Sequence, residues 1–120
     1  MTPSNQRISE LHPDVALRAR ILVDLFKRFG LSIVVTGGRR GYVEQLGLYL
    51  KGRLLPGGVV TGTLRSKHLS GRAFDISVAG FSPDQVPDRL WRTIGRVGEL
   101  LGLSWGGRFP TLKDNPHFEL

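Results

Sequence analysis

The sequence predicts an α+β fold: a small, mostly antiparallel sheet with about three helices packed on it. Helical periodicity is confined to residues 13–29, 42–50 and 90–101, while short strand-like segments fall mostly late, at 31–36, 73–78, 103–105 and 116–120. Few helices and short, late strands favour helices segregated from a sheet over alternating strand–helix–strand units. With 120 residues and 40% hydrophobic content, we expect one domain spanning residues 1–120.

The first half of the chain predicts two helices around one strand. Residues 1–11 read as a polar lead-in, and Pro13 with Asp14 suits the first turn of a helix. The apolar face of that helix recurs at steps of three and four residues, at Val15, Ala19, Leu22, Phe26 and Phe29. His12 is expected to be a surface or capping residue. A buried strand over 31–36 and a helix over 42–50 follow, and then a long loop, 53–65, in which Val59 and Val60 could form an edge strand.

The second half predicts strands around one more helix. Gly71 must turn the chain, after which Asp75 alternates away from Phe74 and Ile76 along a strand. Ser82-Pro83-Asp84 resembles the cap and first turn of the helix that carries Leu90, Ile94, Val97 and Leu101. A short strand ending at Trp105 comes next, and in the terminal strand His117 and Glu119 share one face.

The formal net charge is +7, and the basic excess is concentrated between Lys27 and Arg72, which holds nine Lys or Arg and one acidic residue. Such a surface attracts polyanions, among them an anionic cell envelope, or simply keeps the protein in solution. There are no cysteines, so any metal must be held by nitrogen and oxygen ligands. No apolar run reaches the ~20 residues needed to span a membrane. The N-terminus lacks the apolar region of a secretory signal, so we expect synthesis in a cytoplasm and release by other means.

Asp75 and His117 lie beside apolar neighbours, where a lone charge would be costly, and His68 lies seven residues before Asp75. Two histidines and one aspartate form the ligand set of an open zinc site, whose fourth position is left for water. If Asp75 and His117 lie on neighbouring strands, their side chains can converge, and His68 can complete the set. Asp114 is then placed to act as general base, and Arg40, after the first strand, to stabilise the oxyanion. Each residue alone is more often structural, but the combined pattern is specific.

At these positions the sequence resembles the zinc peptidases of the M15 family, which include D-alanyl-D-alanine carboxypeptidases and dipeptidases and phage L-alanyl-D-glutamate endopeptidases. One family motif is met by Ser66, His68, Gly71, Ala73 and Asp75, and the closing motif by Asp114 and His117. Upstream, Arg40 is followed by Gln45 and by Tyr49, Gly52 and Arg53 as in the family. Gly106-Gly107-Arg108-Phe109 departs from the family pattern, as does Arg39, where an aromatic residue is frequent.

The resemblance implies an M15/hedgehog-like fold with one Zn²⁺ per chain held by His68, Asp75 and His117. It implies Asp114 as general base and Arg40 as a catalytic and substrate-binding residue, and we expect Gln45, Ser66 and Trp105 to bind substrate as well. The expected activity is hydrolysis of a peptidoglycan stem peptide, with L-Ala–D-Glu as the leading bond and D-Ala–D-Ala as the alternative. Aspartate at position 114 resembles the phage endolysins, which wait in the host cytoplasm for a holin and whose lytic action is antimicrobial. We expect a monomer.

Two other classes of function are open. A non-enzymatic, metal-stabilised wall-binding or virion module would carry the same ligands. A nucleic-acid-binding domain is suggested only by charge, because the basic stretch lacks interleaved aromatic residues and shows no reading motif. We therefore expect no specific nucleic-acid partner.

Overall fold

The computed structural model describes residues 2–51, 53 and 67–120. Four α-helices are present in this part of the chain: α1 (Pro3–Ser9), α2 (Pro13–Arg28), α3 (Tyr42–Leu50) and α4 (Asp88–Leu100). The strands are β1 (Ile33–Gly37), β2 (Ala73–Val78), β3 (Ser104–Trp105) and β4 (His117–Glu119). Two short 3-10 helices, η1 (Pro83–Gln85) and η2 (Gly106–Arg108), complete the described elements.

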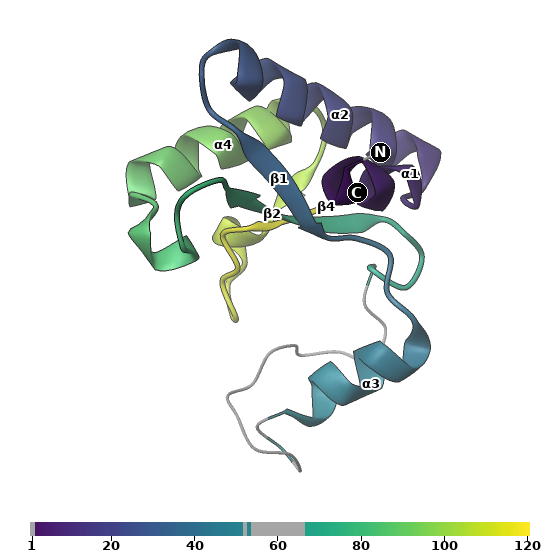
Figure 1. Ribbon diagram of the computed structural model, residues 1–120. Coiled ribbons are helices and arrows are strands. Elements are labelled where there is room, and N and C mark those ends of the chain that lie inside the picture. The colour runs from purple at the N-terminus through teal and green to yellow at the C-terminus, as the bar shows by residue number, and fades with distance from the viewer. Residues whose placement is uncertain (1, 52, 54–66) are drawn as a thin grey trace.

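The four strands form one sheet in the order β1-β2-β4-β3, and every neighbouring pair is antiparallel. Helices α1, α2 and α4 lie together on one side of this sheet, whereas α3 stands away from them (Figure 1). The predicted α+β class with an antiparallel sheet is confirmed. The chain carries one helix more than predicted in the described residues, because α1 was not foreseen.

Strand β2 shows how the sequence divides the two faces of the sheet. Phe74, Ile76 and Val78 are at most 2% exposed and belong to the core that α2 and α4 cover. Asp75 alternates with them and pairs in register with His117 of β4. Because successive side chains of a strand point to opposite faces, Asp75 and His117 lie on the face away from the core. The polar site is therefore on the side of the sheet opposite α2 and α4.

The first eleven residues are not the polar lead-in that the sequence suggested. Residues 3–9 form α1, whose N-terminus is capped by the Thr2 side chain, and Ile8 and Leu11 are buried in the core. Besides Met1, residues 1–11 contain only Ile8 and Leu11 as apolar residues, which give too weak a period to reveal a helix of two turns. The turn after α1 is also tied to the functional half of the chain, since the His12 backbone N–H donates to the Gly71 carbonyl at 2.9 Å.

Two smaller expectations were wrong. Phe29 is 82% exposed rather than part of the apolar face of α2, because the helix ends at Arg28 and the chain reverses at Gly30, whose φ is +85°. The segment Ser82-Pro83-Asp84 caps the separate turn η1 rather than starting α4, which begins at Asp88. His12, in contrast, is the capping residue expected: its Nδ1 accepts from the Asp14 backbone N–H.

The predicted loop over 53–65, with its possible edge strand at Val59 and Val60, lies outside the described residues apart from Arg53. Among the described helices, each is too short or too polar to cross a bilayer.

Candidate metal centre

His68, Asp75 and His117 come together in the structure. Asp75 and His117 are direct cross-strand partners in β2 and β4, and Asp75 Oδ1 lies 3.1 Å from His117 Nδ1. His68 lies in the turn before β2, where Gly71 adopts φ +72° and redirects the chain. This turn places His68 Nε2 3.4 Å from Asp75 Oδ2. One ligand atom from each of the three residues lies within 4.8 Å of the others.

In both His68 and His117, the ring nitrogen that faces away from Asp75 contacts a hydrogen-bond acceptor; we call it the outer nitrogen. His68 Nδ1 lies 2.8 Å from the Gly38 carbonyl, and His117 Nε2 lies 2.8 Å from Glu119 Oε1. A carbonyl and a carboxylate can only accept, so these outer nitrogens carry the protons. In the neutral imidazoles, His68 Nε2 and His117 Nδ1 then present lone pairs toward the carboxylate of Asp75.

This arrangement fits a metal ion. Two lone pairs facing one carboxylate repel it unless a cation lies between them. Metal–ligand bonds of about 2.0–2.1 Å at tetrahedral angles place ligand atoms roughly 3.3 Å apart, close to both separations seen here. Outer N–H groups held by a carbonyl and a carboxylate are the usual second layer of a histidine–metal site. The residues present are therefore suited to a zinc ion.

The two histidines differ in their electrostatic surroundings. Burial lowers the pKa of His68, and the nearby Arg40 charge lowers it further against the opposing effect of Asp75. Burial also acts to lower the pKa of His117, but hydrogen bonds with Asp75 and Glu119 outweigh it and raise that pKa above its ordinary value. Glu119 shows the reverse: burial would raise its pKa, but His117 and Lys67 together lower it. Glu119 is thus held as a carboxylate between His117 and Lys67 Nζ, which lies 3.1 Å away.

Arg40 reaches the same centre from the segment after β1. Its Nη2 lies 3.9 Å from Asp75 Oδ2, and its backbone N–H donates to the His68 carbonyl at 2.8 Å. Its Nη1 donates to Gln45 Oε1 at 2.6 Å. Gln45 has no exposed surface, so it contacts Arg40 from inside the protein. The last residue of β1 lies close to Asp75, since a Cβ on Gly37 would be 3.0 Å from Asp75 Oδ2.

Asp114 is held beside the centre by its backbone. Its N–H donates to the Gly106 carbonyl at 3.0 Å, and its own carbonyl accepts from the His117 N–H at 3.1 Å. The packing there is tight, because a Cβ on Gly106 would lie 2.2 Å from the Asp114 carbonyl oxygen. Although Asp114 is exposed at the surface, neighbouring atoms partly desolvate its carboxyl and raise its pKa. The charge of Asp75 raises that pKa further, while His117 and Arg40 oppose the rise.

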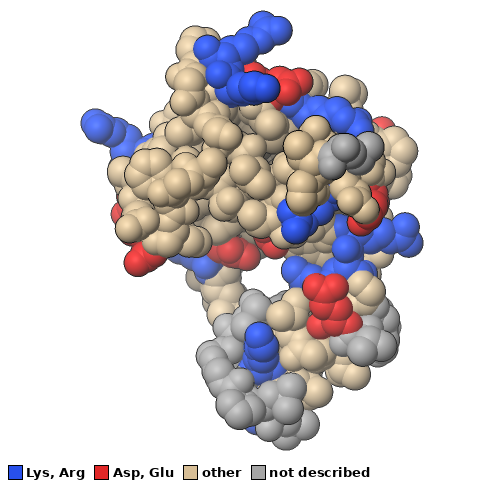
Figure 2. All heavy atoms as spheres, viewed as in Figure 1, with Lys and Arg blue, Asp and Glu red and all other residues tan. Residues whose placement is uncertain are grey.

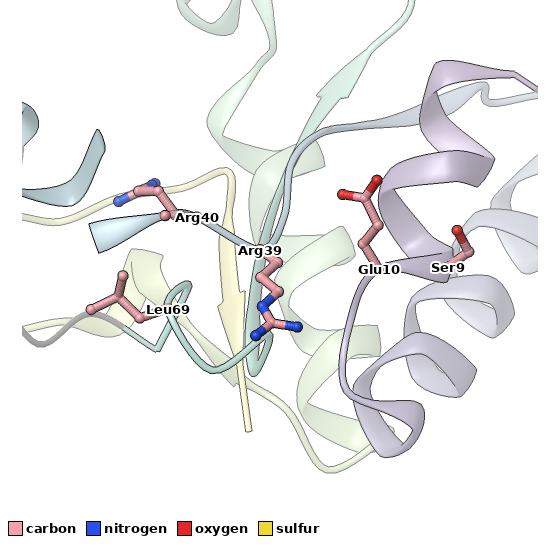
Figure 3. Close-up of a pocket in the computed structure, with 6 residues that line it drawn as sticks. Ser9, Glu10, Arg39, Arg40 and Leu69 are labelled. Carbon is pink, nitrogen blue, oxygen red and sulfur yellow. The ribbon is translucent and has the colours of Figure 1, made fainter. Parts of the chain in front are cut away.

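A hollow of about 860 Å³ lies on the Arg40 side of the centre. Figure 3 shows Arg39 and Arg40 leaving the same segment in different directions, with Leu69 on one side and Ser9 and Glu10 of the α1 region on the other. Arg40 thus belongs both to this hollow and to the centre.

Of the residues selected from the sequence, His68, Asp75, His117 and Arg40 converge, and Asp114 lies beside them. Gln45 is behind Arg40, and Trp105 is 5% exposed, with its Nε1 donating to the Asn115 carbonyl at 2.7 Å. Ser66 lies outside the described residues.

Sequence reasoning did not assign a role to Glu119 or Lys67. The shared face of His117 and Glu119 along the last strand was the available signal for Glu119.

Comparison with known proteins identifies the family. Residues 60–120 match the M15 peptidase family model described as D-alanyl-D-alanine carboxypeptidase. The peptidoglycan L-alanyl-D-glutamate endopeptidase CwlK of Bacillus subtilis (strain 168) is 31% identical over 124 residues, which cover 93% of this chain and 74% of CwlK. The chain belongs to the M15 peptidase family.

Solved structures share the fold of this M15 peptidase. The crystal structure of the Serratia marcescens L-Ala D-Glu endopeptidase ChiX superposes with a TM-score of 0.73 at 27% identity, over 98% of this chain and 85% of ChiX. The vancomycin resistance D,D-pentapeptidase VanY, as an E175A mutant in complex with Zn(II), matches with a TM-score of 0.63 at 16% identity, over 91% of this chain and 71% of VanY. M15 peptidases are zinc-dependent metallopeptidases, and the cluster of His68, Asp75 and His117 could bind such a metal.

Proposed function

We propose that this M15 peptidase hydrolyses an amide bond in the stem peptide of peptidoglycan, with L-Ala–D-Glu as the preferred bond. The observation that carries the proposal is the convergence of His68, Asp75 and His117 beside Asp114 and Arg40. The choice of bond is supported by the similarity to CwlK and ChiX, both of which are named for cleavage between these two residues.

We propose that one zinc ion per chain is held by His68, Asp75 and His117. When bound there, zinc acts as a Lewis acid that polarises the scissile carbonyl and makes a water molecule more acidic. The chain's own contribution is to keep both imidazoles in the required tautomer through Gly38 and Glu119.

Asp114 and Arg40 have separate roles in this proposal. The Asp114 carboxylate accepts a proton from the attacking water and returns it to the departing amine, so that the C–N bond breaks as a neutral amine leaves. Arg40 stabilises negative charge on the substrate carbonyl oxygen or binds a substrate carboxylate. Gln45 acts by orienting Arg40, since its side chain is buried and accepts from that guanidinium. Ser66 and Trp105 remain proposed substrate contacts, and Arg39, which lines the hollow beside Arg40, is a further candidate.

Cleavage of D-Ala–D-Ala is the second candidate. It is supported by the description of the matching family model as D-alanyl-D-alanine carboxypeptidase. The two activities use the same centre and differ in which part of the stem peptide occupies it.

We further propose that residues 1–120 form one catalytic domain that works as a monomer at the cell wall, as a bacteriolytic endolysin of the phage type. Aspartate at position 114 supports this comparison, as does the net charge of +7, which favours contact with an anionic envelope. Figure 2 shows Lys and Arg side chains spread over one face of the molecule, with Asp and Glu side chains among them.

The first prediction concerns the bond and the base. Zinc-loaded protein incubated with purified peptidoglycan should release peptides that begin with D-Glu, identified by mass spectrometry, while free D-Ala would indicate the second candidate.

Asp114→Asn should lower kcat by roughly 10²–10⁴-fold, because a positioned general base contributes a factor of that size. Its zinc content should equal that of the original protein.

His117→Ala provides the contrasting variant, since it should lose both zinc and activity. If the original protein releases neither product, or if Asp114→Asn turns over at the original rate, the proposed mechanism is wrong.

A further inference from the structure

A second hollow, which we call the Phe109 groove, begins on the other flank of His117. The Phe109 ring lies 5.7 Å from the His117 ring, centroid to centroid, and also lines this groove, which has a volume of about 870 Å³. The groove runs between the start of α4 and the segment that follows β3. Lys113 and Asn115 line it too, and they are the immediate sequence neighbours of Asp114. The wall of the groove and the proposed general base therefore belong to one short segment.

The solvent-facing part of this wall is positively charged. Arg92, Arg108 and Lys113 line the groove and are exposed, whereas Asp88 is the one acidic residue among its described lining residues. Arg108 already has an anionic partner, since its Nε donates to Glu99 Oε2 at 2.5 Å. Arg92 and Lys113 form no ion pair within the part of the chain that the structure describes. Two cations are therefore available for a ligand.

The aromatic part of the wall serves as support. Trp91 and Trp105 are 3% and 5% exposed, which leaves little ring surface on which a sugar could stack. The Trp105 indole is covered by the backbone of Gly107, where a Cβ would lie 2.2 Å from the ring, and its Nε1 donates to the Asn115 carbonyl. Because Asn115 follows Asp114, this contact fixes the segment that carries Lys113. The groove thus has a rigid wall that carries positive charges, which favours an anionic ligand over a carbohydrate.

We propose that the Phe109 groove binds a free carboxylate on the stem-peptide residue that adjoins the scissile bond, through Lys113 and Arg92. In a stem peptide cut between L-Ala and D-Glu, that group is the α-carboxylate of D-Glu, because the chain continues through its γ-carboxyl. Lys113 lies next to Asp114 in the sequence and meets this carboxylate near the centre, while Arg92 adds positive charge from α4. Charge-assisted hydrogen bonds to carboxylates are stronger than neutral ones, so the free acid is preferred over its amide. This inference rests on the proposed function and names the chemical feature that the site selects.

The test compares two tripeptides, L-Ala–γ-D-Glu–L-Lys with a free α-carboxylate and the same peptide with an α-carboxamide. The original protein should have the higher kcat/KM for the free acid. The double variant Lys113→Ala/Arg92→Ala should lose roughly tenfold or more in kcat/KM on the free acid, mainly through a higher KM. Loss of one hydrogen bond between charged groups weakens binding by about that factor. Its kcat/KM on the amide should change little, so the preference disappears.

Arg89→Ala is the matched control, because Arg89 is an exposed arginine of α4 that does not line the groove. It removes positive charge from the same helix and should leave the acid–amide preference unchanged. Equal losses on both peptides in the double variant would overturn the proposal. So would an Arg89→Ala protein that loses the acid–amide preference as the double variant does, since this would indicate a general effect of net charge.

A binding measurement separates this inference from the proposed function. Calorimetric titration of the zinc-free protein with each tripeptide requires no turnover. Tighter binding of the free acid, abolished by Lys113→Ala/Arg92→Ala, would support the groove even if no peptide is cleaved and the proposed function fails. Equal binding of acid and amide by the original protein would overturn the groove proposal even if hydrolysis proceeds.

Discussion

At the scale of single residues, the centre depends on the groups that hold the outer nitrogens of its histidines. The Gly38 carbonyl engages His68, and Glu119 engages His117. Glu119 is itself held by Lys67, which lies 3.1 Å away. These contacts fix which ring nitrogen is free to bind a metal, so in the proposed site Glu119 should affect zinc affinity without being a ligand.

The second prediction therefore concerns Glu119. Glu119→Ala should weaken zinc binding by roughly 10–100-fold, because loss of the acceptor frees the His117 ring and lowers its basicity. The measurement is a competition titration against a chromophoric chelator.

Asp24→Ala serves as the control, since it removes one exposed negative charge from α2 and should leave zinc affinity unaltered. Equal zinc affinity in Glu119→Ala and the original protein would show that the Glu119 contact has no part in metal binding.

Residue types at this scale were predictable, whereas their partners were not. Asp75 and His117 stood out because each lies beside apolar neighbours where an isolated polar group is costly, and His68 stood out because it lies seven residues before Asp75. Gln45 also stood out, but its burial behind Arg40 depends on the packing of α3 against the segment after β1. No local pattern reports such a contact.

At the scale of secondary structure, the turn between His68 and Asp75 determines whether the proposed ligands meet. Gly71 adopts φ +72°, and a Cβ there would lie 2.9 Å from the His12 backbone nitrogen. The Gly71 carbonyl also accepts from that nitrogen. The turn that carries His68 is thus held against His12, between α1 and α2. The packing of these helices therefore helps to set the position of His68.

The third prediction compares two glycine substitutions. Gly80→Ala should cost about 1–2 kcal/mol of unfolding free energy, because alanine is strained at a positive φ. At Gly80, with φ +86°, no atom lies within 4 Å of the added Cβ, so strain is the whole effect. Gly71→Ala should cost more, because its Cβ also meets His12, and it should weaken zinc binding. Denaturant titration and zinc competition measure both.

Gly80→Ala isolates the backbone effect and should retain the original zinc affinity. Equal stability losses for the two variants would mean that His12 moves aside without cost.

The elements themselves were largely predictable. α2, α3, α4 and the four strands fall where hydrophobic periodicity placed them, because a period of 3.6 or 2 residues is a local property. α1 was missed since it buries Ile8 alone within its span, and its stability comes from packing on β1 rather than from its own pattern.

At the scale of the whole molecule, the centre joins distant parts of the chain. His68 precedes β2, Asp75 is in β2 and His117 is in β4, so an ion bound as proposed would link the middle of the sequence to its C-terminal strand. Any ligand that binds only the folded state stabilises it by mass action.

The fourth prediction follows from this linkage. Zinc at 100 times its dissociation constant should raise the free energy of unfolding by about 2.7 kcal/mol, and a chelator should reverse the gain. Thermal unfolding with and without zinc measures the effect. His117→Ala should show no such shift while unfolding near the temperature of the zinc-free original protein; a zinc-induced shift preserved in His117→Ala would place the ion elsewhere.

The sequence alone determined the chemistry available to this M15 peptidase: the nitrogen and oxygen ligands, the expected base, the basic charge and the periodic helices and strands. These are properties of residue type and of spacing over a few positions. Only the tertiary structure decided that Gly38 orients His68 across 30 residues and that Asp75 meets His117 across 42. It also decided that Arg92 and Lys113 border one groove beside Phe109. Contacts of this kind depend on strand register and on how helices pack, and both are settled by burial over the whole chain.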